Sequence, residues 1–97
     1  MRTSRNKAEI MSGGHFDYDQ YRIARIADDV EQLIKNNGRE PWCDFGPETM
    51  SKFQEAVRLL RQAHIYAHRI DYLVSGDDGE DSFHERLADD LNKVEVR

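Results

Sequence analysis

The segment HIYAHRID contains the residue types, at the spacing, that could hold a metal ion. His64, His68 and Asp71 stand at positions i, i+4 and i+7, within about 60° of one another on one face of a helix. Two imidazoles one turn apart can share a metal, and a carboxylate can complete three ligands. The metalloprotease motif would need a glutamate where this chain has Ile65. A fourth ligand would have to come from a partner chain or from one of three distant residues, His15, His84 and Glu85. We therefore favour histidines that border an apolar stripe with Asp71 as charge partner, and we expect no metal and no cofactor.

A cluster of carboxylates in SGDDGEDS raises the question of a calcium or magnesium site. An EF-hand loop that began at Asp77 would have Gly79 at its third position and Ser82 at its sixth, so the calcium pattern fails. Asp77, Asp78 and Asp81 could bind magnesium, but the sequence has no phosphate-binding motif to accompany such a site. The cluster is therefore interpreted as an acidic loop that precedes a helix.

Nucleophilic catalysis has little support in the sequence. Cys43 is the only cysteine and stands beside Asp44, which does not favour a thiolate. The chain also lacks the hydrolase, P-loop and dinucleotide-binding motifs. We therefore expect a protein that is not an enzyme, and a metal-dependent enzyme is the third hypothesis.

The segment MSGGHFDYDQY, residues 11–21, has the composition of a helix start. Asp17 is predicted to be the N-cap, Gln20 to complete a capping box, and Phe16 and Tyr21 to form a hydrophobic staple. The alternative is a pocket between the starts of the first and third helices, which an antiparallel arrangement would bring together. A nucleotide-type signalling molecule would contact the residues of this pocket, which are His15, Asp17, Tyr18, Tyr21 and His84.

Three stretches with apolar residues at steps of three and four predict helices at about 18–36, 47–74 and 81–94. Gly38 and Pro47 mark the end of the first and the start of the second. The third is predicted to be capped by Ser82, in a capping box with Glu85, or by Asp81. The second helix would be about 42 Å long, with an apolar face too wide for one short helix to cover. We predict an all-α, small three-helix domain with a long central helix, which could also form a homodimer seam.

Composition limits the class of protein. The chain has 97 residues, enough for one domain, which we place at residues 12–97 after a flexible tail at residues 1–11. No apolar run is long enough for a transmembrane helix, and no secretory signal is recognisable, so a cytoplasmic setting is expected. The net charge of −5 arises entirely in residues 75–97, which carry eight acidic and three basic side chains. This distribution argues against nucleic-acid binding and favours a basic protein partner.

The connector REPWCDFGP is apolar for a loop. Trp42 and Phe45 are expected either to plug the end of the helical core, which we favour, or to anchor a partner. The predicted partner-binding set adds to these two the acidic residues near and within the third helix, namely Asp77, Asp78, Glu80, Asp81, Asp89 and Asp90.

Two strings, SGGHFDYDQYRIARIADDVEQLI and IDYLVSGDDGEDSFHERLADDL, resemble short bacteriophage and prophage proteins that begin MSGGHFDY. The resemblance covers most of residues 11–91 and would make residues 1–10 an extension before Met11. It implies the setting of an infected or lysogenic bacterium, where small phage proteins often bind a host protein, including defence machinery. Our first functional hypothesis is therefore a non-enzymatic protein that occupies a basic host factor, and the small-ligand binder is the alternative.

Overall fold

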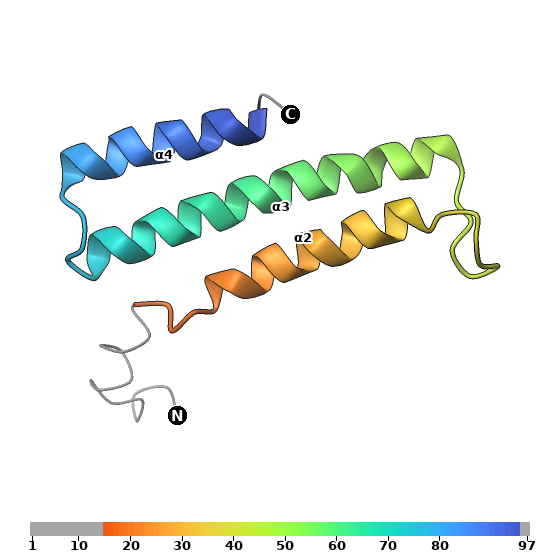
Figure 1. The fold of residues 1–97 in the computed structure, drawn as a ribbon, viewed down its shortest axis with the longest axis horizontal. Coiled ribbons are helices and arrows are strands. Elements are labelled where there is room, and N and C mark those ends of the chain that lie inside the picture. Colours follow the sequence, from red (N-terminus) through yellow and green to blue (C-terminus); the bar gives the residue numbers. More distant parts are fainter. Residues whose placement is uncertain (1–14, 96–97) are drawn as a thin grey trace.

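A computed structural model describes residues 15–95 and contains three helices: α2 (Gln20–Lys35), α3 (Pro47–Val74) and α4 (Glu80–Glu95) (Figure 1). The described residues form no β-strand, and their isolated β-bridge joins Glu40 to Cys43. The prediction of a small all-α domain with a long central helix is confirmed. The predicted tail at residues 1–11 lies outside the described residues.

The helix α3 is the centre of the fold. Figure 1 shows α2 along one flank of α3 and α4 along the other, each antiparallel to it. Within the described chain, α2 and α4 do not contact each other. The three helices therefore form a flat layer, with dimensions of 47 × 34 × 15 Å. Its radius of gyration is 17.0 Å, whereas a compact domain of this size would have about 12 Å.

Local signals set most helix ends where the sequence predicted them. Gly38 has a φ of +89°, the left-handed conformation that glycine adopts without strain after the end of α2. Pro47 is the first residue of α3. Between them, the side chain of Asn37 accepts the N–H of Phe45 at 2.8 Å and donates to its carbonyl at 3.0 Å. These bonds hold the connector against the end of α2.

The start of α2 differs from the predicted capping box. Asp17 has a φ of 56° and Tyr18 a φ of 66°, so neither has the backbone of an N-cap. They are the central residues of a turn closed by a hydrogen bond from Asp19 N–H to the Phe16 carbonyl at 3.0 Å. Asp19 precedes the helix without a side-chain capping bond. Gln20 turns inward to α3, where its amide Nε2 lies 3.5 Å from the Asp71 carboxylate. This contact with α3 replaces the predicted bond from the Gln20 side chain back to the N-cap.

The start of α4 is also shifted from the prediction. The helix begins at Glu80, so Gly79 takes the position predicted for Asp81 or Ser82. Ser82 is the third helical residue, and its Oγ accepts the N–H of Gly79 at 3.2 Å. This is the bond that the third residue makes in a capping box, without the reciprocal bond from a side chain at the cap.

The layer buries few apolar side chains. Among the described residues, the buried hydrophobic ones are Ala27 and Cys43. Trp42 is 66% exposed and Phe45 is also exposed, so the favoured prediction that they plug the core is wrong. Cys43 fills that place instead, with its Sγ 3.6 Å from the Leu33 carbonyl. A layer one helix thick cannot enclose a core, because a core needs elements packed on both sides.

No described helix combines the length and the apolar character that a membrane crossing requires.

Candidate functional site

The buried carboxylate of Asp71 ties the centre of the fold to the start of α2. Its Oδ1 accepts the backbone N–H of Phe16 at 2.9 Å, and its Oδ2 lies 3.5 Å from Gln20 Nε2. The N–H of His15 donates to Ser75 Oγ at 3.1 Å, at the end of α3. The predicted convergence of the first helix start with the end of the second helix is therefore present.

The histidines of the HIYAHRID segment do not form a metal site with Asp71. His64 and His68 stack, with ring centroids 5.8 Å apart and an interplanar angle of 21°. His64 Nδ1 lies 2.9 Å from the Gln20 carbonyl, which only accepts, so this nitrogen carries the proton. Asp71 is engaged with residues 16 and 20 instead. The described residues contain no group of three or more His, Cys, Asp or Glu side chains placed to hold a metal ion.

Aromatic rings surround His68. Tyr21 lies 5.8 Å from it and Tyr72 4.6 Å, measured between ring centroids. Arg69 stacks over the Tyr72 ring at 5.3 Å. Burial lowers the pKa of His68, and the positive charge of Arg69 and the neighbouring His64 lower it further. His68 Nδ1 is buried without a hydrogen-bond partner in the described structure. The arrangement favours a neutral imidazole within an aromatic cluster.

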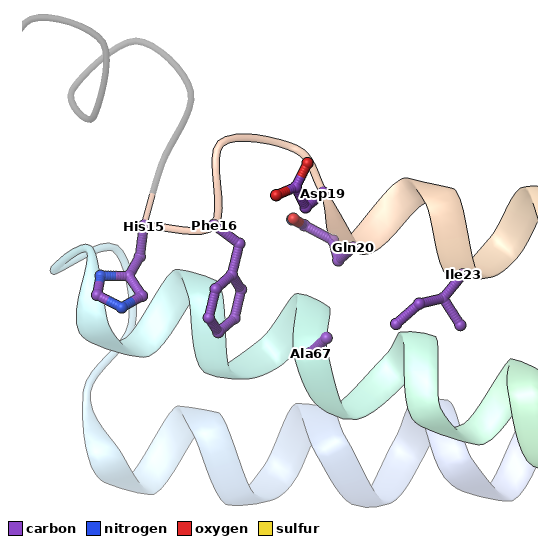
Figure 2. A pocket seen from close by; sticks show the side chains of 6 residues that line it. All are labelled: His15, Phe16, Asp19, Gln20, Ile23 and Ala67. Carbon is purple, nitrogen blue, oxygen red and sulfur yellow. The ribbon is translucent and has the colours of Figure 1, made fainter. Parts of the chain in front are cut away.

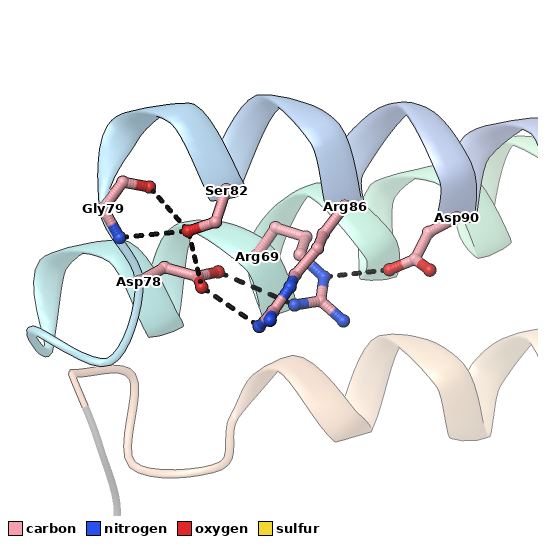
Figure 3. A network of polar contacts seen from close by, with 6 residues as sticks. All are labelled: Arg69, Asp78, Gly79, Ser82, Arg86 and Asp90. Atoms are coloured by element: carbon pink, nitrogen blue, oxygen red, sulfur yellow. Dashed lines mark hydrogen bonds and ion pairs between the residues drawn. The ribbon is translucent and has the colours of Figure 1, made fainter.

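A polar network joins α3 to α4 (Figure 3). Arg69 Nε donates to Asp90 at 2.9 Å, and Arg69 Nη1 forms an ion pair of 3.7 Å with Asp78. Asp78 also accepts from Arg86 at 3.1 Å and from the Ser82 hydroxyl at 3.1 Å. The Asp78 side chain is only 2% exposed. Its charge therefore acts within the fold, where it secures the loop between the two helices.

The predicted acidic partner surface is thus divided into two groups. Asp78 and Asp90 are engaged with arginines, as described above, and Asp90 is half-buried. The other four residues of the set are exposed, and no described side chain forms an ion pair with them: Asp77, Glu80, Asp81 and Asp89. Asp81 and Asp89 stand eight positions apart on α4 with the exposed Glu85 between them, so these three share one side of the helix. We call Asp77, Glu80, Asp81, Glu85 and Asp89 the acidic rim.

The two exposed aromatic residues of the predicted partner set lie far from the acidic rim. Trp42 and Phe45 precede the start of α3, whereas the rim begins after its end (Figure 1). Twenty-eight residues of helix separate these ends by about 42 Å. Phe45 contacts Phe53 at 5.6 Å between centroids, and Trp42 extends from the connector.

An open pocket of about 340 Å³ lies between the start of α2 and α3 (Figure 2). It is lined by His15, Phe16, Asp19, Gln20, Ile23 and Ala67. Of the predicted ligand-binding set, only His15 lines it. Asp17 and Tyr18 form the preceding turn, Tyr21 contacts the two histidines of α3, and His84 contacts Phe83. Gln20 Oε1 is buried without a hydrogen-bond partner in the described structure.

Two residues that organise the layer are not evident from the sequence pattern. The pattern predicts Gln20 in a local cap, but its side chain is buried and directed to α3. Arg61 donates to Asp28 at 2.8 Å and to Glu31 at 2.9 Å across the α2–α3 contact. The sequence does contain a signal for this contact. Arg61 stands near the apolar stripe of the second helix, and acidic residues stand on the first helix.

Comparison of the chain with protein families, with curated proteins and with solved structures gave no match.

Proposed function

We propose that this chain is a small non-enzymatic binding protein that works by contacting another protein. The observation that supports this most directly is the exposure of large apolar side chains on the helices. Ile26, Leu59, Tyr66 and Val74 are each between 46% and 52% exposed. Exposed apolar patches on small proteins commonly mark surfaces that contact other molecules.

The acidic rim indicates the charge of the host partner. Its carboxylates face solvent without intramolecular ion pairs to described residues, so they are available to basic side chains. Such charges steer a partner and select it more than they add affinity. The resemblance to phage proteins adds the proposed setting, the cytoplasm of an infected or lysogenic bacterium. The partner would be a basic host protein, such as a defence component.

Charge reversal on the rim tests this proposal. The double variant Asp81→Lys/Asp89→Lys should reduce capture of a host protein from bacterial lysate by at least about tenfold, and added salt should weaken capture by the wild type. The matched control is Asp29→Lys, which reverses an exposed charge on α2. Quantitative mass spectrometry of the captured proteins compares the three chains. Equal capture by all of them would mean that the rim is only solvated.

The pocket beside α2 supports a second function, the binding of a small ligand. Gln20 Oε1 is an unused acceptor in a residue that lines the pocket, so a ligand group that donates a hydrogen bond would suit it. Asp19 lies in the same lining, and its negative charge would repel a phosphate there. The donor edge of a nucleobase fits this chemistry. Thermal unfolding with a panel of nucleobases and nucleosides should then show a raised Tm for at least one compound, and an unchanged Tm throughout would reject this function.

A further inference from the structure

The central helix has one flat side that neither neighbouring helix covers. Asp71 bonds to the start of α2 and Arg69 to α4, on opposite flanks of α3. Ile70 stands between them in sequence, so it projects about 100° from each, toward one flat side of the layer. Every residue of α3 from position 56 to 74 within about 60° of Ile70 is apolar. These residues are Ala56, Leu59, Ala63, Tyr66, Ala67, Ile70, Leu73 and Val74.

The opposite side of the layer is the more polar one, although Val57 and Ile65 also project toward it. Arg61 projects about 180° from Ile70, and His68 and Tyr72 about 160°. Arg61 bonds to carboxylates of α2, and His68 packs between Tyr21 and Tyr72. The two sides of the layer therefore differ in chemistry.

The helix α2 extends the apolar side. Tyr21 and Asp28 contact residues of the polar side, namely His68 and Arg61. Several apolar residues of α2 project about 140–180° away from Tyr21, and three of them are Ile23, Ile26 and Val30. Ile23 and Ala67 line the same pocket, which places the apolar residues of the two helices on one side. We call the eight residues of α3 and these three of α2 the apolar face.

We propose that a second copy of this chain covers the apolar face and forms a symmetric dimer of two stacked layers. The dimer rests on the proposed function as a binding protein. It assigns the exposed apolar side chains of that protein to one partner, a second copy of the chain. Stacking two layers supplies the packed core that a single layer lacks. It would remove Leu59, Tyr66, Val74 and Ile26 from water, each now about half exposed.

The composition and size of the apolar face suit a copy of itself. In a twofold dimer the same surface meets itself, so a charged patch would face its own sign, and the apolar face contains no charged residue. Its length from residue 56 to 74 is about 27 Å, and the two helices that carry it are about 20 Å wide side by side. The resulting area of about 540 Å² per copy, or about 1,100 Å² for the pair, just exceeds the roughly 1,000 Å² that a specific protein–protein interface needs. The acidic rim and Trp42, at the edge and the end of the layer, would stay accessible to a host protein.

Native mass spectrometry of the full chain, together with light scattering, tests the dimer. The expected mass is twice the 11.4 kDa of one chain at micromolar concentration. Leu59→Glu places a charge within the contact and should raise the dimer Kd at least about 100-fold. Gln54→Glu, an exposed site on the polar side of the same helix, is the matched control and should keep the wild-type Kd. A wild type that is monomeric at every concentration, or a Leu59→Glu variant that dimerises as well as wild type, would overturn the proposal.

Cysteine cross-linking provides a test that does not depend on a disruptive variant. Ala63 is exposed near the middle of the apolar stripe, so in a twofold dimer its copies would lie close together. In a Cys43→Ser background, Ala63→Cys should oxidise to a covalent dimer, whereas Gln54→Cys should not. Equal and slow cross-linking of both would argue against the proposed contact. The double variant Asp81→Lys/Asp89→Lys should lose host capture but still dimerise. Host binding by the acidic rim and dimerisation through the apolar face can therefore be tested separately. A monomeric wild type that still captures a host protein would refute only the dimer.

Discussion

The carboxylate of Asp71 lies 2.9 Å from the backbone nitrogen of Phe16, although 55 positions separate the two residues in sequence. This bond joins the end of the central helix to the turn before α2. The turn contains two non-glycine residues with positive φ, Asp17 and Tyr18. For Tyr18 the left-handed backbone costs about 1–2 kcal/mol, so bonds from outside the turn must hold it.

Removing the charge of Asp71 should therefore loosen the start of α2. Asp71→Asn keeps the size of the side chain but turns an amide donor toward Phe16 N–H or Gln20 Nε2. We expect the free energy of unfolding to fall by about 1–2 kcal/mol, measured by urea denaturation. Hydrogen exchange should quicken first at residues 16–20. Asp29→Asn, an exposed change on α2, should keep the free energy of unfolding within about 0.5 kcal/mol of wild type. Equal losses of stability in both variants would contradict a stabilising bond between Asp71 and the start of α2.

The two residues of the Asp78–Arg86 ion pair should contribute unequally to the free energy of unfolding. The Asp78 side chain is 2% exposed and the Arg86 side chain 56%. Asp78→Asn leaves the partly buried Arg69 with Asp90 as its remaining ion-pair partner and should cost about 1–3 kcal/mol in the free energy of unfolding. Arg86→Gln removes an exposed group and should cost less than about 1 kcal/mol. If the arginine variant proved the more damaging of the two, the network would not depend on Asp78.

Gly76 in the α3–α4 loop offers a test of backbone conformation. It has a φ of +89°, and a Cβ there would meet no atom within 4 Å. Any loss from Gly76→Ala is therefore conformational, and we expect about 1 kcal/mol less stability. Gly76→Asn enters the same open space with a residue that tolerates the left-handed conformation, so its loss should be smaller. Chemical denaturation of both variants compares them, and equal losses would show that φ is not the cause.

His68 should make stability depend on pH. Burial, followed by the charge of Arg69, lowers its pKa in the folded chain, so the unfolded chain binds a proton more readily. The free energy of unfolding should consequently be highest above the ordinary pKa of about 6.5 and should decrease as the pH falls below it. Urea unfolding between pH 5.5 and 7.5, at intervals of about half a unit, measures this slope. His68→Gln should flatten it, whereas His84→Gln, an exposed change, should keep the wild-type slope. A slope unaltered by His68→Gln would assign the effect to other groups.

Helix positions were largely predictable because they depend on local patterns. The bounds of α3 match the prediction, and those of α2 and α4 differ by one or two residues. Gly38 and Gly76 take the left-handed conformation expected of glycines that end helices. The predicted caps failed where a side chain found a distant partner: Gln20 bonds toward Asp71 instead of back to the cap.

Sequence by itself determined three helices, their order and the long central one, because periodicity and chain punctuation act over a few residues. Only the tertiary structure decided how the wide apolar surface of α3 is divided between two flanking helices and an open side. The periodicity of one helix shows that a surface is apolar but does not show which neighbour covers it. The tertiary structure likewise decided that Cys43 is buried while Trp42 is exposed, and that Asp78 is paired while Asp81 is not. Neighbours in sequence can face opposite environments, and those environments exist only once the helices have packed.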